Sequence, residues 1–298
     1  MLPIATEHVL IHGSRIAYSI FSPGSSSSKK EDPEPVVLLH GTPSSSLIWR
    51  NIIPRLTSAG YKVHVYDLLG YGASERPCDP SIDTSISGQV PILEALLAHW
   101  ALDKAGSTFH LVAHDIGGGI AQRFGTRSPR RLHLRSLTMI DVVSFDSYPS
   151  QRTKAQLELG LEQLMKASDE EHRVHFKDWL LSAVHNQQRF EETSLNTFLS
   201  YISGPIGQAS LFQHQIRHYD PKHTMEVSDQ LYRLGEVPVK LIWGGDDKWQ
   251  TVEWGVRLQR AIPGSELEVL EECGHFAMED QPEKIAGLIV GFLGGKSG

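Results

Sequence analysis

The chain has 298 residues, of which 40% are hydrophobic, 8% aromatic and 21% charged. This apolar content excludes a disordered chain, and 26 Gly and 16 Pro without a three-residue period exclude collagen. A formal net charge of −7, with no cluster of Lys and Arg, argues against a nucleic-acid partner. The length and composition therefore predict an ordinary globular protein.

The cysteines and the N-terminus bear on the cellular compartment. The two cysteines, Cys78 and Cys273, lie far apart and outside any C-x-x-C pattern, so neither a disulfide framework nor a zinc knuckle is expected. The N-terminal residues lack a basic segment followed by a long apolar run, and apolar stretches elsewhere fall short of the roughly 18 residues of a membrane span. We therefore expect a cytoplasmic protein without a membrane span.

Strand and helix patterns alternate through the first 143 residues. A hairpin opens the chain, with apolar runs at 9–11 and 16–20 around the turn residues His12-Gly13-Ser14. The run at 36–39 is apolar on every side, which is typical of a parallel strand buried on both faces. Further strand patterns lie at 63–66, 109–113 and 137–140. Helical spacing lies between them at 47–56, 86–100 and 117–124. This order predicts an α/β protein with a mostly parallel, doubly wound sheet.

Residues 144–236 interrupt this alternation. They contain no buried-strand run, and their apolar residues have helical spacing, as in Leu195, Phe198 and Ile202. Strand patterns resume at 237–243 and 267–270, and helical patterns at 254–261 and 282–293. We therefore predict a core of residues 1–143 and 237–298, with 144–236 inserted as a helical cap beyond the carboxyl ends of the strands, where ligands bind.

One segment places a reactive side chain between a strand and a helix. In Ala113-His114-Asp115-Ile116-Gly117, small residues stand two positions before and after Asp115. This is the nucleophile-elbow pattern G-x-S-x-G, with Asp115 in place of serine and Ala113 in place of the first glycine. Small neighbours are needed because the turn is sharp, so the pattern indicates Asp115 as a nucleophile.

Further motifs follow other predicted strands. In His40-Gly41-Thr42-Pro43, a backbone N–H can pair with that of Ile116 to form an oxyanion hole. Trp243-Gly244-Gly245-Asp246-Asp247 and Cys273-Gly274-His275-Phe276 complete the chain order nucleophile, acid, base. With the segment from Tyr66 to Ser74, these motifs resemble the α/β-hydrolase superfamily across nearly the whole chain. Residues 40–51 look especially like haloalkane dehalogenases and their epoxide hydrolase relatives.

The resemblance implies a role for each motif residue. Asp115 is the nucleophile, His275 the base and Asp247 the acid that orients the base. If the acid motif is aligned one residue earlier, Asp246 is the acid instead. Asp141, after the next predicted strand, is another candidate acid, because some dehalogenase relatives place theirs there. The backbone N–H groups of Thr42 and Ile116 form the oxyanion hole, and their side chains have no part in that role.

An aspartate nucleophile favours particular substrates. With a reference pKa near ~3.9, Asp115 is ionised at neutral pH and can attack without a base. Attack on an ester carbonyl would give a labile mixed anhydride, whereas attack on an electrophilic sp³ carbon gives a stable ester. We therefore expect an epoxide or a carbon–halogen bond in the substrate, with His275 activating the water that hydrolyses the ester.

The leaving group separates these two reactions. Haloalkane dehalogenases place Trp after the nucleophile and often Asn in the oxyanion loop, whereas this chain has Ile116 and Thr42. Epoxide hydrolases use lid tyrosines, for which Tyr219 and Tyr201 are candidates and Tyr148 a third, although such tyrosines are often packing residues. His40, His114, Trp49 and Phe276 are expected to bind substrate.

We thus predict an epoxide hydrolase that acts on a small lipophilic metabolite without a cofactor or metal. His214 and His218 have i,i+4 spacing but no third ligand. The alternatives are a haloalkane dehalogenase-like hydrolase, a lyase or cyclase that uses Asp115 as a general base, and a ligand-binding protein. The expected partner is the small-molecule substrate, and a homodimer is left open.

Overall fold

A central sheet organises the chain in the computed structural model, which describes all residues except 1–3, 25–32, 80, 159–160 and 296–298. The described residues form an eight-stranded sheet in the order β1-β2-β4-β3-β5-β6-β7-β8. β2 pairs antiparallel with β1 and β4, and the other neighbours pair in parallel. The strands are β1 Glu7–Ile11, β2 Ser14–Phe21, β3 Pro35–Leu39, β4 Lys62–Tyr66, β5 Phe109–His114, β6 Leu134–Ile140, β7 Val239–Gly244 and β8 Glu266–Leu270. The predicted mostly parallel sheet is confirmed.

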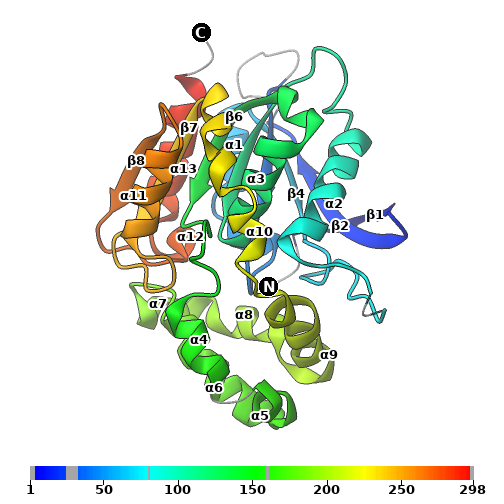
Figure 1. The fold of residues 1–298 in the computed structure, drawn as a ribbon, viewed down its shortest axis with the longest axis vertical. Helices are drawn as coiled ribbons and strands as arrows, with labels where there is room; N and C mark the ends of the chain where they lie inside the picture. The colour runs from blue at the N-terminus through cyan, green and yellow to red at the C-terminus, as the bar shows by residue number, and fades with distance from the viewer. Residues whose placement is uncertain (1–3, 25–32, 80, 159–160, 296–298) are drawn as a thin grey trace.

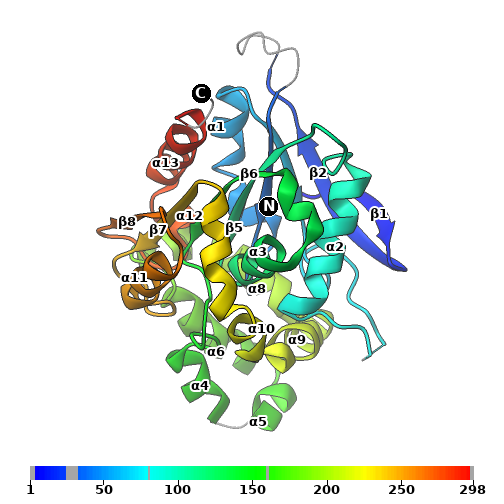
Figure 2. The same cartoon turned by 45° about the horizontal axis from the view of Figure 1, so that its top comes forward.

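Alternate residues of the central strands face two separate hydrophobic cores. Val36 and Leu38 of β3 belong to one core, and Val37 and Leu39 to the other. Helices α1 (Ile53–Ser58) and α13 (Pro282–Gly294) contribute to the first core, and α2 (Ile86–His99), α3 (Ile116–Arg127) and α11 (Val252–Ala261) to the second. Figure 2 shows these helices on the two faces of the sheet. Burial of each large apolar side chain stabilises the fold by roughly 1.5–3 kcal/mol.

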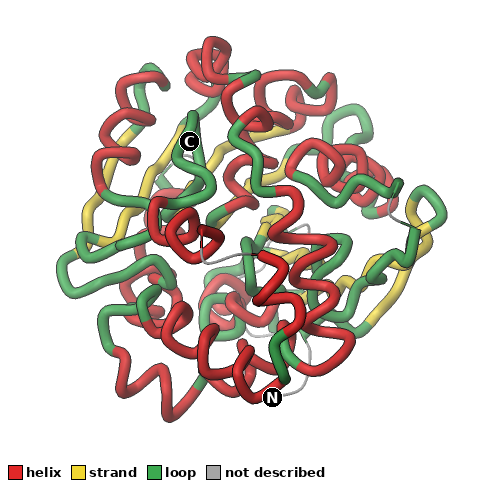
Figure 3. Tube along the Cα trace, turned by 60° about the horizontal axis from the view of Figure 1, so that its bottom comes forward, coloured by secondary structure: helices red, strands yellow, loops and turns green. Residues whose placement is uncertain are grey.

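A group of helices, called the cap helices below, lies beyond one end of the sheet, at the bottom of Figure 1. They are α4 Gln151–Glu158, α5 Leu161–Lys166, α6 Asp169–Leu181, α7 Gln187–Thr193, α8 Leu195–Ile202 and α9 Gly204–Ser210. Figure 3 shows helices in front of the strands when this end comes forward. The apolar residues of α8 are buried, as their spacing predicts. None of the described helices combines the length and apolar character that crossing a bilayer requires.

The chain after α9 is irregular and returns to the sheet. A π-helix at Leu211–Gln215 leads into a 3₁₀-helix at Ile216–His218, where apolar spacing alone predicted a regular helix. Apolar spacing does not reveal this change, because it concerns the register of backbone hydrogen bonds. Helix α10 (Lys222–Met225) and a 3₁₀-helix at Ser228–Glu236 then pack against α3. These last residues of the predicted insertion thus contact the core, and the division into core and cap stays a prediction.

The chain enters and leaves the cap helices at one place. The Thr224 hydroxyl donates a hydrogen bond of 2.5 Å to the carbonyl oxygen of Phe145. The rings of Tyr148 and Tyr219 lie 4.8 Å apart between centroids. Residues before α4 therefore contact residues after α9, next to the carboxyl ends of β5 and β6.

Remaining short elements connect these parts. They are a 3₁₀-helix at Ser46–Trp49, a 3₁₀-helix at Pro129–His133 and α12 at Ala277–Asp280. The first of these is capped by Ser45, whose side chain accepts a hydrogen bond from the Leu47 amide. It leads from the loop after β3 into α1.

Candidate active site

Asp115 occupies a strained turn between β5 and α3. Its φ of 51° and ψ of −123° are rare for a residue with a side chain. The neighbouring glycines allow the close approach: a Cβ on Gly117 would lie 2.6 Å from the His40 carbonyl oxygen, and one on Gly118 would lie 2.2 Å from the Val142 side chain. The local sequence therefore produces the predicted elbow and directs Asp115 to the carboxyl end of the sheet.

Two backbone amides lie at the Asp115 carboxylate. The Thr42 N–H donates to Oδ1 at 2.6 Å. Burial raises the pKa of this carboxyl group, and the Ile116 N–H is among the groups that oppose that rise. Gly41 permits the approach of the Thr42 loop, because a Cβ there would lie 2.3 Å from Cβ of Asp115. The structure thus brings both predicted oxyanion-hole amides to Asp115.

His275 lies between Asp115 and Asp247. Its Nε2 is 3.5 Å from Oδ2 of Asp115, and its Nδ1 donates to Oδ2 of Asp247 at 2.8 Å. The other oxygen of Asp247 accepts from the amides of Trp249 at 2.7 Å and Gln250 at 2.9 Å. Since Asp247 is buried and held by these amides, it fixes the orientation of the imidazole ring.

The charges of this group stabilise one another. Burial on its own lowers the pKa of His275, but the Asp247 carboxylate and the contact with Asp115 outweigh it and raise that pKa to about 10. Burial likewise raises the pKa of Asp115, whereas the hydrogen bond and charge of His275 hold it below its ordinary value. The resting site therefore contains an imidazolium between two carboxylates.

The structure places the two alternative acids elsewhere. Asp246 is exposed and pairs with His185 at 2.7 Å, so it does not orient His275. Asp141 is buried at the end of β6, where its Oδ1 accepts from the Gly244 amide at 2.7 Å. Burial and the neighbouring Asp247 charge raise the pKa of Asp141 well above its usual range. Asp247 is the acid that contacts His275.

A group of hydroxyls lies beside Asp115. Oγ1 of Thr42 is 3.3 Å from the Tyr219 hydroxyl. Tyr71 also lies near the Thr42 side chain. Burial raises the pKa of Tyr71, Tyr148 and Tyr219, and the Asp115 charge raises it further. These three phenols therefore stay protonated at neutral pH. They are called the tyrosine cluster below.

Tyr201, the other predicted donor, lies outside the tyrosine cluster. Its hydroxyl lies near Ser45, and its backbone oxygen accepts from Arg76 at 3.4 Å. The helical pattern did not separate Tyr201 from Tyr219, because both stand on apolar stripes. The contacts favour Tyr219 and Tyr148 as the hydroxyls near Asp115.

Two histidines expected to bind substrate, His40 and His114, make hydrogen bonds within the protein. Both ring nitrogens of His40 are bonded, Nδ1 to the Gly41 oxygen at 3.0 Å and Nε2 to the Leu68 amide at 2.9 Å. His114 is buried, and its Nε2 bonds to the backbone oxygen of His275 at 2.9 Å. His40 thus joins the loops after β3 and β4, and His114 holds the backbone of His275. The role of the two histidines toward a substrate stays a prediction.

Trp49 and Phe276 are buried in the hydrophobic core that also includes the apolar side of the cap helices. The Phe276 ring lies 5.6 Å from that of His275. Their role toward a substrate stays a prediction. The sequence motifs did not single out Trp249, whose ring lies 4.9 Å from His275 and stacks on Trp179 at 4.5 Å. Its position two residues after Asp247 is the signal that could have revealed it.

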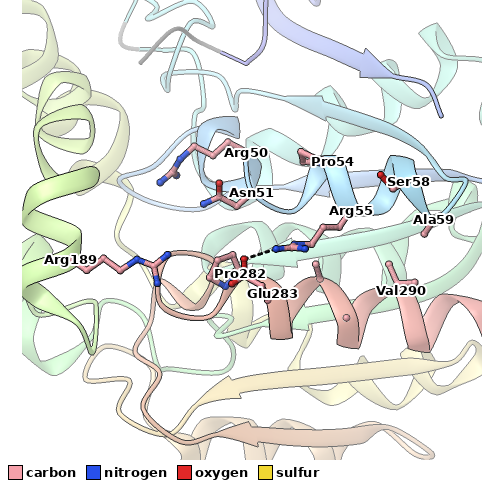
Figure 4. Close-up of a pocket in the computed structure, with 12 residues that line it drawn as sticks. Arg50, Asn51, Pro54, Arg55, Ser58, Ala59, Arg189, Pro282, Glu283 and Val290 are labelled. Atoms are coloured by element: carbon pink, nitrogen blue, oxygen red, sulfur yellow. Dashed lines mark hydrogen bonds and ion pairs between the residues drawn. The ribbon is translucent and has the colours of Figure 1, made fainter. Parts of the chain in front are cut away.

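A hollow of about 760 Å³ on the outer surface lies apart from this site. Figure 4 shows it between α1 and α13, with Arg189 reaching toward it from α7. An ion pair between Arg55 and Glu283 crosses it at 2.5 Å. The described residues contain no group of three His, Cys, Asp or Glu side chains arranged to hold a metal ion. The chemistry-bearing side chains are concentrated at the carboxyl ends of β3, β5, β7 and β8.

The fold and the site together define a hydrolase built on a doubly wound sheet. The chain belongs to the alpha/beta hydrolase family, whose model matches residues 36–288. The predicted α/β-hydrolase fold is thereby confirmed.

Known relatives agree on this family. The chain is 26% identical to a 2-hydroxy-6-oxononadienedioate/2-hydroxy-6-oxononatrienedioate hydrolase of Paraburkholderia phymatum, over 88% of this chain and 87% of the relative. An α/β hydrolase fold protein from Burkholderia ambifaria aligns with a TM-score of 0.79 at 26% identity, over 96% of this chain and 97% of that one. A meta-cleavage product hydrolase from Pseudomonas fluorescens IP01 has the same fold, with a TM-score of 0.74, 20% identity and 98% coverage of both chains.

Proposed function

We propose that the protein hydrolyses epoxides through a covalent ester on Asp115. One observation carries the proposal: one oxygen of the Asp115 carboxylate accepts the Thr42 amide, and the other faces His275 at 3.5 Å. A carboxylate in this position is already ionised and needs no base for attack. The tyrosine cluster supports an epoxide, because ring opening produces an alkoxide that needs a proton.

In the first step, an Asp115 oxygen attacks an epoxide carbon and the carbon–oxygen bond of the ring breaks. The released alkoxide takes a proton from the hydroxyl of Tyr219 or Tyr148. The imidazolium proton of His275 then replaces the proton that the phenol has given. The products are a neutral ester on Asp115, a neutral phenol and a neutral His275.

In the second step, His275 takes a proton from water, and the hydroxide attacks the carbonyl carbon of the Asp115 ester. Ester formation has removed the Asp115 charge that helped to raise the pKa of His275, so the ring can now act as a base. The Thr42 and Ile116 amides stabilise the oxyanion. The diol leaves with the proton of the new carboxyl group, and the Asp115 carboxylate and the His275 imidazolium are restored.

The relatives' names favour a different substrate, 2-hydroxy-6-oxononadienedioate. Attack of Asp115 on a carbonyl carbon of such a substrate would give a labile anhydride, and this favours an epoxide for the present chain. A haloalkane would form the same Asp115 ester and is the second candidate. A lyase or a binding protein would form no ester.

The test uses His275→Gln, which keeps Asp115 but removes the base. We expect this variant, mixed with a panel of epoxides and haloalkanes, to accumulate an adduct on the Asp115 peptide, detected by mass spectrometry. Asp115→Asn is the matched control and should form none. Wild-type protein turning over in ¹⁸O-water should incorporate the label into Asp115. Turnover without an adduct in His275→Gln and without label in the wild type would exclude the ester.

A further inference from the structure

The Thr42 side chain links the oxyanion loop to the segment that follows the cap helices. Its hydroxyl donates to Oε1 of Gln215 at 2.9 Å. Because Thr42 has one hydroxyl proton, the contact of 3.3 Å with Tyr219 requires the phenol to donate to Thr42 in the resting site. The phenol turns this proton to the alkoxide when the epoxide ring opens. Thr42 thus orients the Tyr219 hydroxyl, and Gln215 orients Thr42.

The backbone places both partners of Thr42 on one short segment. Gln215 is the last residue of the π-helix, and Tyr219 directly follows the 3₁₀-helix after it. Gln215 is buried, as is Thr42. A π-turn changes the direction of the side chains that follow it, and such turns are frequent at functional sites. Here the irregular segment brings an amide and a phenol to the same oxygen atom.

We propose that the Thr42 hydroxyl and the Gln215 amide are positioning groups that hold Tyr219 beside Asp115 for ring opening. This inference rests on the proposed function. It gives Thr42 two separate tasks: its backbone N–H acts on the ester in the second step, and its side chain acts through Tyr219 in the first. Substitution of the side chain should therefore affect one step and spare the other.

The matched control is Thr84. Its hydroxyl also donates to the segment after the cap helices, to the backbone oxygen of His214 at 3.0 Å, and it is likewise buried. Thr84→Val removes a threonine hydroxyl bond of the same kind, but one that does not reach Tyr219. Thr42→Ser keeps the hydroxyl, whereas Thr42→Val and Gln215→Leu remove one partner each.

The experiment measures adduct formation on Asp115 in a His275→Gln background with an epoxide that labels the parent. We expect Thr42→Val and Gln215→Leu to slow labelling about tenfold, the effect of losing one well-placed hydrogen bond. Thr42→Ser and Thr84→Val should stay within about twofold of the parent. With His275 intact, hydrolysis of the ester in a single turnover should slow far less in Thr42→Val than labelling does. Equal labelling in Thr42→Val and Thr84→Val, or an equal loss in both steps, would overturn the inference.

A measurement without substrate separates this inference from the proposed function. We expect Thr42→Val and Gln215→Leu to increase hydrogen exchange in the peptide covering residues 211–219, with Thr42→Ser like the wild type. If no epoxide labels His275→Gln, the epoxide proposal fails and the exchange data decide whether Thr42 holds this segment. Unchanged exchange in Thr42→Val would contradict the positioning role whatever the substrate.

Discussion

Asp141 and Asp247 follow the neighbouring strands β6 and β7, yet their surroundings favour different protonation states. Asp247 receives two backbone amides and the imidazole of His275. Asp141 receives the Gly244 amide on one oxygen, and its other oxygen is buried without such a partner among the described residues. A buried carboxyl group close to a second carboxylate favours its protonated form. Since burial and the Asp247 charge raise the pKa of Asp141, Asp141 is the neutral partner.

Asparagine mimics this neutral acid, so Asp141→Asn should keep most of the activity. Asp247→Asn removes the negative charge that stabilises His275 and should slow ester hydrolysis by about 10²–10⁴-fold. Steady-state turnover of a substrate that labels Asp115 compares the two variants, and infrared absorption of the protonated carboxyl group should disappear in Asp141→Asn. Equal losses in both variants would mean that Asp141 carries the charge.

At the scale of single residues, the sequence predicts what depends on local spacing. Asp115 and His275 stand in short motifs directly after strands, and the structure brings their side chains together. Spacing could not decide between Asp141 and Asp247, because both follow strands that are neighbours in the sheet. It also missed Tyr71, whose contact with Thr42 depends on how two loops meet.

Among the elements, β4 carries a histidine in an apolar setting. His64 is 1% exposed, and its ring lies 4.9 Å from that of Trp100. Burial, assisted by the charge of Lys62, lowers the pKa of His64 from 6.5 to about 3. The histidine is therefore neutral in the folded protein but takes up a proton in the unfolded chain below about pH 6.5.

Stability should consequently fall as the pH decreases from about 6.5 to about 3, because the unfolded state binds more protons in this window. The contribution of His64 is on the order of 4 kcal/mol. His64→Leu should flatten the dependence of the unfolding free energy on pH, measured with denaturant between pH 4 and pH 7. His8→Gln, at an exposed position in β1, serves as the control. A dependence as steep in His64→Leu as in the wild type would contradict the assignment.

The elements themselves were predictable to different degrees. Strand β3 could be predicted because burial on both faces leaves an unbroken apolar run. The π-helix at Leu211–Gln215 could not, since its apolar residues also fit an α-helix. The contact of its last residue, Gln215, with Thr42 joins residues distant in the sequence, which local spacing does not reveal.

At the scale of the whole molecule, Arg50 connects the core to the cap helices. Its guanidinium binds Glu279 of α12 through two nitrogens at 2.5 and 2.7 Å. It also donates to the hydroxyl of Ser194, between α7 and α8, at 2.9 Å. The Ser194 hydroxyl donates in turn to Glu279 at 2.8 Å. The ion pair is largely buried, with 17% and 5% of the two side chains exposed.

Glu279→Gln should weaken this connection, because it leaves the Arg50 charge without a counter-ion. We expect a loss of about 3–5 kcal/mol in unfolding free energy, together with faster cleavage of the cap helices in limited proteolysis. Arg55→Gln is the matched control: it breaks the exposed pair with Glu283 across the outer hollow and should cost less than about 1 kcal/mol. Similar melting temperatures for the two variants would rule out a connecting role for Glu279.

The hydrogen bond between Thr224 and Phe145 brings the two ends of the segment that contains the cap helices together. An inserted segment whose two ends are in contact can be lengthened, shortened or exchanged without moving a strand. The entropy cost of closing such a segment grows only slowly with its length. Asp115, His275 and Asp247 lie on loops of the sheet and would keep their geometry through such exchanges. Evolution can therefore change the cap helices while the loops that carry the catalytic residues stay the same. A new substrate specificity then does not require new catalytic residues.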